Sequence, residues 1–218
     1  MRSRPIVLFD LDGTLTDSRG GITACIRHAL DRVGHPCPDD EALAIYVGPP
    51  LRGTLSTLLG TTDTALIETA LGHYRARYEA VGLFENRVYD EVPAMLEAIA
   101  RRGHAMAVAT AKMRHTATRI VEHFALARHF TAVYGAEPEG RFDAKIDLLA
   151  HLIESGVIRA EAAVMVGDRA SDIVAAKING IRSIGALWGY GEPGELAAAG
   201  ADALCETPRA LPDCLARD

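Results

Sequence analysis

Two aspartates stand two residues apart directly after a short apolar run near the start of the chain. The run Ile6 to Phe9 is followed by Asp10, Asp12, Gly13 and Thr14. One carboxylate in such a pair can attack phosphorus, while its neighbour protonates the leaving oxygen and later activates water. Gly13 and Thr14 would supply flexible backbone and a hydroxyl for phosphate oxygens. The pattern predicts phosphoryl transfer, with a solvated turn as the alternative for the pair taken alone.

A second pair of aspartates follows a later apolar run at residues 163–166, and these are Asp168 and Asp172. Oxygen ligands with retained waters suit magnesium, so Asp10, Asp168 and a backbone carbonyl near Asp12 form a candidate Mg²⁺ site. Asp172 is expected to ligate through water or to orient a lysine. Its alternative role is that of a helix N-cap or first-turn acid.

The chain contains only three lysines but twenty arginines, so each lysine suggests a specific role. The segment Thr110-Ala111-Lys112 ends one apolar run, and its hydroxyl and amide groups are predicted to hold a transferred phosphoryl group. Lys145 is predicted to neutralise phosphoryl and carboxylate charge. The alternatives are that Thr110 caps the next helix and that Lys145 faces solvent. Lys177 is interpreted as a surface residue.

Apolar, β-branched runs recur along the chain, and helix-like segments separate the later ones. This alternation predicts an α/β fold with a doubly wound parallel sheet, at whose carboxyl edge the acids, the threonine and the lysines meet. The expected strands are 6–9, 105–109, 130–134, 163–166 and 182–187, and a late surface helix and turn is expected at 195–203.

A long interval separates the first two expected strands. It holds about 95 residues, whereas a parallel crossover needs about a dozen. We therefore expect a Rossmann-like core, residues 1–15 and 89–218, with a small helical cap inserted at 16–88. Its expected helices span 22–33, 40–47, 51–59 and 64–81, with breaks at Gly34, at Gly48-Pro49-Pro50 and at Gly60 and hinges near 16–20 and 85–88.

The composition of the chain indicates which classes of partner and which cellular location to expect. The chain is 49% hydrophobic with a net charge of -6, and no apolar run reaches the length of a membrane span. The absence of a basic stripe argues against a nucleic-acid polymer and favours a small phosphorylated metabolite. The four cysteines lack metal-ligand spacing and are interpreted as scattered structural thiols. We expect a cytoplasmic protein without membrane association.

Four segments, in this order, resemble the motifs of the haloacid dehalogenase superfamily of phosphatases. Residues 10–18 look like its first motif, which implies Asp10 as nucleophile and Asp12 as general acid and base. Thr110-Ala111-Lys112 resembles the second motif, Lys145 the third and residues 167–172 the fourth. The resemblance spans nearly the whole chain and implies a magnesium-dependent phosphatase.

The expected cap is similar to the type found in the phosphoglycolate phosphatase and 5'-nucleotidase branch. The segments 48–51 and 187–191 also look like that branch. The branch resemblance makes phosphoglycolate and nucleoside 5'-monophosphates the leading substrates. Arg52 is the cap residue expected to contact the substrate, unless it is an ordinary solvated residue. Trp188 and Tyr190 are expected either to line the site entrance or to be buried under the last helix.

Other functions within and outside this superfamily would require different residues or a different arrangement of the chain. The cap has no lysine for a phosphonatase, and a dehalogenase would not need an acid at Asp12. A sugar phosphomutase remains an alternative because it would keep both acids. A receiver-type switch or a catalytically inactive phosphate-binding protein is an alternative of another class, although a receiver would not carry a cap after its first strand. Either a monomer or a homodimer is compatible with the sequence.

Overall fold

The computed structural model describes residues 5–47, 51–137 and 140–216. The chain divides into two compact units, of which the first, the core unit, joins Met1–Thr16 to Val88–Asp218. The second, the helical unit, is Asp17–Arg87. The divisions fall one residue from each of the boundaries expected from the sequence.

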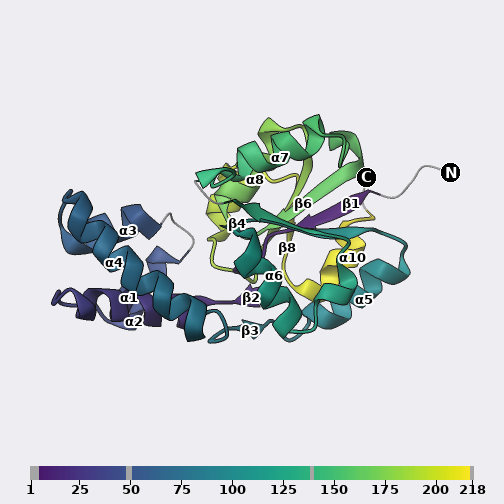
Figure 1. Ribbon diagram of the computed structural model, residues 1–218. Helices are drawn as coiled ribbons and strands as arrows, with labels where there is room; N and C mark the ends of the chain where they lie inside the picture. Colours follow the sequence, from purple (N-terminus) through teal and green to yellow (C-terminus); the bar gives the residue numbers. More distant parts are fainter. Residues whose placement is uncertain (1–4, 48–50, 138–139, 217–218) are drawn as a thin grey trace. The chain divides into compact units, whose positions relative to one another are not determined.

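The core unit contains a six-stranded sheet in which every neighbouring pair is parallel (Figure 1). The strand order is β5-β4-β1-β6-β7-β8. β1 is central and buried between β4 and β6, and the order reverses there, which is the place where doubly wound folds bind ligands. The strands are β1 (Ile6–Phe9), β4 (Met106–Met113), β5 (Val133–Ala136), β6 (Ala163–Gly167), β7 (Arg182–Ala186) and β8 (Ala203–Cys205).

Helices cover both faces of this sheet (Figure 1). One face carries α5 (Val92–Arg101), α6 (Arg114–His123) and α10 (Leu211–Cys214), and the other carries α7 (Lys145–Glu154) and α8 (Ala170–Ile178). In α5 the buried residues Val92, Met95, Leu96 and Ile99 have the spacing of one helix face, which is why it packs as an amphipathic helix. The predicted doubly wound α/β fold is confirmed. The remaining pieces of this unit are α9 (Pro193–Ala198) and the 3₁₀ turns η3 (Ala127–His129), η5 (Ala160–Ala162) and η6 (Pro208–Ala210).

Three expectations about the strands are corrected. β8 was not expected, because its three residues pair only as an edge strand and carry little periodic signal. β5 begins at Val133 instead of residue 130, because residues 130–132 form an irregular connection between the turn η3, which ends at His129, and the strand. β4 continues to Met113 and shifts its register against β5 between Ala109 and Met113.

The helical unit holds α1 (Arg19–Arg32), α2 (Asp40–Leu43), α3 (Leu51–Leu59) and α4 (Thr64–Arg77). A 3₁₀ turn, η1 (Ala44–Tyr46), follows α2, and a π-helical turn, η2 (Tyr78–Gly82), extends α4. Gly34 and Gly60 have φ angles of 70° and 62°, and this left-handed backbone ends α1 and α3. The break expected at Gly48-Pro49-Pro50 lies outside the described residues.

Two short strands lie where the units divide. β2 (Thr16–Asp17) and β3 (Arg87–Val88) form a two-stranded sheet. Arg87 Nη2 lies 2.9 Å from Asp17 Oδ2, so an ion pair links the two strands. Among the described residues, no helix combines the length and apolarity needed to cross a membrane.

Candidate active site

The first two acids lie in a tight turn at the carboxyl end of β1. The Leu15 amide donates to the Leu11 carbonyl at 2.9 Å and closes this turn. Gly13 has a φ of 83°, and a Cβ there would lie 2.1 Å from Asp168 Oδ2. Only glycine fits both the backbone angle and the space, so Gly13 lets the turn approach the second acidic segment.

Asp168 follows β6 and is fully buried. Its Oδ1 accepts a hydrogen bond from Thr14 Oγ1 at 3.0 Å, and its Oδ2 accepts one from the Tyr190 amide at 2.8 Å. The Thr14 hydroxyl, predicted to bind phosphate, is buried and donates a hydrogen bond to Asp168 in this structure, so phosphate contact by Thr14 stays a prediction. Thr14 therefore positions an acid.

Three carboxylates gather at this edge of the sheet. Asp10, Asp168 and Asp172 each place an oxygen within 4.8 Å of the others. Burial, together with the neighbouring charges of Asp172 and Asp10, raises the pKa of Asp168 to about 8, although hydrogen bonds from the Tyr190 amide and Thr14 act to lower it. The Oδ1 atom of Asp12 is also buried and has no hydrogen-bond partner among the described residues. This hard, oxygen-rich donor set fits a divalent cation such as Mg²⁺.

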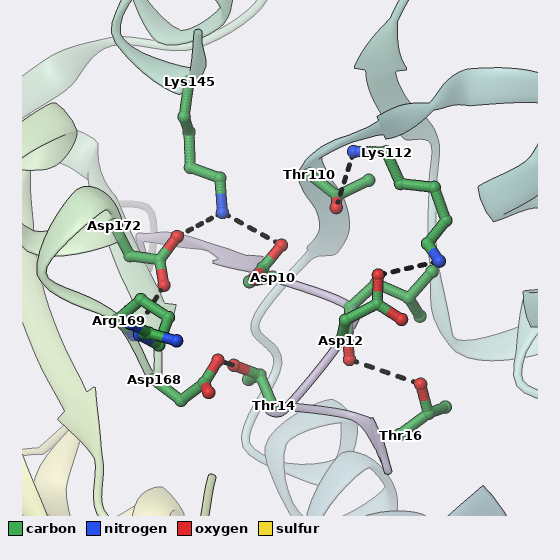
Figure 2. Close-up of polar contacts among 11 residues, drawn as sticks. Asp10, Asp12, Thr14, Thr16, Thr110, Lys112, Lys145, Asp168, Arg169 and Asp172 are labelled. Atoms are coloured by element: carbon green, nitrogen blue, oxygen red, sulfur yellow. Dashed lines mark hydrogen bonds and ion pairs between the residues drawn. The ribbon is translucent and has the colours of Figure 1, made fainter. Parts of the chain in front are cut away.

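Lys145 brings a positive charge to the same acids (Figure 2). It begins α7, and with Leu148, Leu149 and Leu152 it forms the buried face of that helix. Its Nζ atom lies 2.9 Å from Asp10 Oδ1 and also contacts Asp172 Oδ1. Burial lowers the pKa of Lys145, but the charges of Asp10 and Asp172 more than reverse this, so the pKa is raised and the amine stays charged. The alternative of a solvent-facing lysine is wrong.

Asp172 uses both carboxylate oxygens within the protein. Oδ1 contacts Lys145, and Oδ2 accepts a hydrogen bond from the Arg169 amide at 3.0 Å. The second contact belongs to a capping box at the start of α8. Asp172 therefore orients Lys145 and caps helix α8, so two of its predicted roles coexist. Both of its carboxylate oxygens already have partners within the protein.

The Thr110-Ala111-Lys112 segment lies at the register shift of β4, where such irregularities redirect side chains. Thr110 is inside the strand and α6 begins later, at Arg114, so the alternative of a helix cap is wrong. The Lys112 amide donates to Thr110 Oγ1 at 3.2 Å. Lys112 Nζ forms an ion pair with Asp12 Oδ2 at 2.8 Å, as Figure 2 shows. The sequence placed Lys112 at the edge where the acids meet, but it did not predict the ion pair with Asp12.

Arg52 belongs to the helical unit and lies in the first turn of α3. Its side chain is 58% exposed and forms an ion pair with Glu68, with Nη2 and Oε1 2.6 Å apart. This arrangement matches the alternative of a solvated residue in a helical first turn. Contact with a substrate stays a prediction.

A loop after β7 supports the site, and its supporting role was missed in the sequence. Trp188 Nε1 donates to the Thr14 carbonyl at 2.9 Å, and the Tyr190 amide donates to Asp168. A Cβ at Gly189 would lie 2.2 Å from Asp168 Cβ, and one at Gly191 would lie 1.9 Å from the Asp168 carbonyl oxygen. Two glycines alternating with aromatic residues at the catalytic edge of the sheet were the available signal.

The fold and the site together define an α/β enzyme of the phosphoryl-transfer class. Its marks are four aspartates and two lysines at the carboxyl edge of a doubly wound sheet, with a helical insertion after the first strand. The chain belongs to the haloacid dehalogenase-like hydrolase family, whose model matches residues 7–186. The resemblance seen in the sequence is thereby confirmed.

Three curated proteins with named activities are similar in sequence to most of this chain. A 5'-nucleotidase of Pseudomonas aeruginosa is 45% identical over 194 residues, covering 89% of this chain and 87% of that protein. The tyrosine-protein kinase PtkA of Mycobacterium tuberculosis is 41% identical over 189 residues, covering 87% of this chain but only 64% of that longer protein. A phosphoglycolate phosphatase of Xanthomonas campestris is 32% identical over 214 residues, covering 97% and 96%.

A solved structure shows the same fold. The crystal structure of a predicted phosphatase from Clostridium acetobutylicum superimposes with a TM-score of 0.90 at 36% identity, covering 98% of each chain. The match extends over both the core and the helical residues of this chain.

Proposed function

We propose that this hydrolase cleaves small phosphomonoesters through an aspartyl-phosphate intermediate and depends on magnesium. The observation that carries the proposal is the position of Asp10. It directly follows the central strand β1, shares a cluster with Asp168 and Asp172, and pairs with the buried Lys145. A carboxylate supported by a fixed positive charge in a water-poor site is suited to stabilise charge on a transferring phosphoryl group.

Each side chain of the site has its own proposed role in the reaction. Lys145 holds Oδ1 of Asp10, and Oδ2 attacks phosphorus as the bond to the leaving oxygen breaks. Asp12 gives its proton to that oxygen. Asp12 then takes a proton from a water molecule, which attacks the aspartyl phosphate to release inorganic phosphate and restore Asp10. Thr110, Ala111 and Lys112 line the same edge and are proposed to contact the phosphoryl oxygens.

Asp10, Asp168 and the backbone carbonyl of Asp12 would hold the magnesium ion. The bound ion supplies positive charge that offsets the carboxylates and the phosphoryl group. The clustered oxygens and the raised pKa of Asp168 support this part of the proposal. Thr14 and the Tyr190 amide keep Asp168 in place for that role.

Nucleoside 5'-monophosphates and phosphoglycolate are the proposed substrates. The names of the Pseudomonas and Xanthomonas relatives support these two small anionic metabolites. Arg52 is the proposed contact to the part of the substrate beyond the phosphate, because its planar guanidinium suits carboxylate or phosphate oxygens. A sugar phosphomutase is the alternative within the family.

Phosphate release from a panel of esters tests the proposal. The panel contains 2-phosphoglycolate, nucleoside 5'-monophosphates, hexose phosphates and an aryl phosphate, each assayed with magnesium and with a chelator. We expect magnesium-dependent release that Asp10→Asn abolishes while circular dichroism shows an unchanged fold. Absence of release from every ester by folded, magnesium-loaded protein would replace hydrolysis with a mutase or a phosphate-binding switch.

A second candidate comes from the kinase relative. Its name points to phosphoryl transfer from a nucleotide to tyrosine, and 41% identity makes the comparison worth testing. Incubation with labelled ATP and a tyrosine-containing peptide separates the two activities. Peptide labelling that exceeds ester hydrolysis and is lost in Asp10→Asn would favour the kinase.

A further inference from the structure

Two of the four cysteines lie side by side at the C-terminal end of the core unit. Cys205 is the last residue of β8, Cys214 is the last residue of α10, and their sulfur atoms are 3.4 Å apart. The side chains are 1% and 9% exposed. The interpretation of all four cysteines as scattered thiols is therefore wrong for this pair, which the fold brings together across eight intervening residues.

The surrounding structure holds both sulfurs in place. Cys205 pairs with Ala186 in the sheet, and Arg182 Nη2 donates to the Cys214 carbonyl at 3.1 Å. Arg102 Nη2 forms an ion pair with Asp213 Oδ1 at 2.5 Å, which fixes the end of α10 against the rest of the core. A disulfide has an S–S distance of about 2.05 Å, so the sulfurs need to approach by only about 1.4 Å.

We propose that Cys205 and Cys214 form an intramolecular disulfide when the protein meets a peroxide. The Cys214 sulfur attacks one peroxide oxygen, which forms an S–O bond, breaks the O–O bond and releases water. The Cys205 sulfur then displaces that oxygen as a second water. The two thiols together lose two electrons and two protons, and hydrogen peroxide is reduced to two waters.

The Cys205–Cys214 pair is hydrogen-bonded to the loop that holds Asp168 in place. The Cys205 carbonyl accepts a hydrogen bond from the Leu187 amide at 2.9 Å, and Leu187 opens the loop whose Tyr190 amide binds Asp168. The other two cysteines belong to the helical unit, where Cys25 contacts Arg77 Nη1 at 3.1 Å and Cys37 is half-exposed. They provide internal controls in the same molecule.

Peptide mapping tests the proposal on the intact protein, independently of its catalytic activity. Trypsin is expected to separate the two thiols into peptides 183–209 and 210–217, with Cys25 in 20–27 and Cys37 in 33–52. Folded protein is treated with hydrogen peroxide, quenched with catalase, and alkylated in denaturant without reductant. We expect one cross-linked species joining 183–209 to 210–217, about 2 Da lighter than the summed peptides, which dithiothreitol converts back to two alkylatable peptides.

Two variants sharpen the result. Cys37→Ser should retain the cross-linked species, and Cys214→Ser should lose it while Cys205 becomes alkylatable. Separate alkylation of both thiols in peroxide-treated wild type, or a Cys214 sulfinic acid beside an alkylated Cys205, would overturn the proposal. A disulfide between two chains instead of within one would overturn it as well, and non-reducing electrophoresis detects that product.

Discussion

Lys112 Nζ lies 2.8 Å from Asp12 Oδ2, and both side chains are mostly shielded from solvent. The ion pair fixes the direction of the carboxylate that is proposed to carry protons to and from the substrate. Lys112 lies within the register shift of β4 against β5, an irregularity of the kind that redirects side chains. A residue first interpreted as a phosphate contact thus positions an acid in this structure.

Replacing Lys112 by methionine should lower kcat roughly 10- to 100-fold with a smaller change in KM, because the acid loses its positioning partner. Steady-state kinetics on the best ester of the panel measure both constants. Lys177→Met is the matched control, since this lysine is exposed on α8. Equal kcat values for Lys112→Met and the control would return Lys112 to a structural role.

Lys145→Ala should abolish measurable turnover and lower the free energy of unfolding by about 3–5 kcal/mol, because it leaves two buried carboxylates without their cation. Urea denaturation without metal measures the stability. Adding Asp172→Asn to Lys145→Ala should recover part of the lost stability by removing one of the two charges. A double variant as unstable as the sum of its single variants would show that the three side chains are not energetically coupled.

The raised pKa of Asp168 predicts how stability depends on pH in the absence of metal. An unfolded aspartate has a pKa of about 4, whereas burial holds the pKa of the folded Asp168 at about 8. Between these values the folded state binds more protons than the unfolded state, so the free energy of unfolding falls as pH rises from about 4 to about 8. Saturating Mg²⁺ should flatten this slope, because the ion takes the place of the proton.

Denaturant unfolding with a chelator, repeated across that pH window, measures the slope. Asp168→Asn should reduce it, since an amide does not titrate and the other ionisable groups remain. Identical slopes for the wild type and Asp168→Asn would mean that other residues cause the pH dependence.

Gly189→Ala should lower the free energy of unfolding by about 1–3 kcal/mol and weaken magnesium-dependent activity. Its Cβ would lie 2.2 Å from Asp168 Cβ and 2.4 Å from the Gly13 carbonyl oxygen, so the acid must move. Thermal unfolding with and without Mg²⁺, together with kcat/KM, measures both effects. Gly194→Ala is the control, because a Cβ there meets no heavy atom within 4 Å. Equal behaviour of the two variants would contradict the supporting role of the loop.

The alternation of apolar runs and helical segments was enough to predict five of the six strands of the sheet, the inserted helices and the edge at which Asp10, Asp168 and Lys145 meet. These features depend on local periodicity and on a general property of parallel sheets. The burial of Lys145 was also readable, because it continues the apolar stripe of Leu148, Leu149 and Leu152.

Other features depend on partners far away in the chain. Lys112 lies in a register shift between two strands, and the hydroxyl of Thr14 donates a hydrogen bond to an acid 154 residues later. The supporting role of the loop around Gly189 is evident only from its close approach to Asp168 in the folded structure. The spacing of residues within one segment does not determine such long-range contacts. Identifying these contacts therefore required the folded structure.

The hydrogen bonds around Asp168 have a consequence for the order of events during synthesis. The acid is held by Thr14 from the start of the chain and by Tyr190 from near its end. Asp10 and Asp12 are synthesised well before Asp168 and Tyr190, so the contacts that fix Asp168 are complete only after residue 190 has emerged from the ribosome. The proposed magnesium site would therefore be complete only in the folded core, and a bound ion would stabilise that state and not the nascent chain.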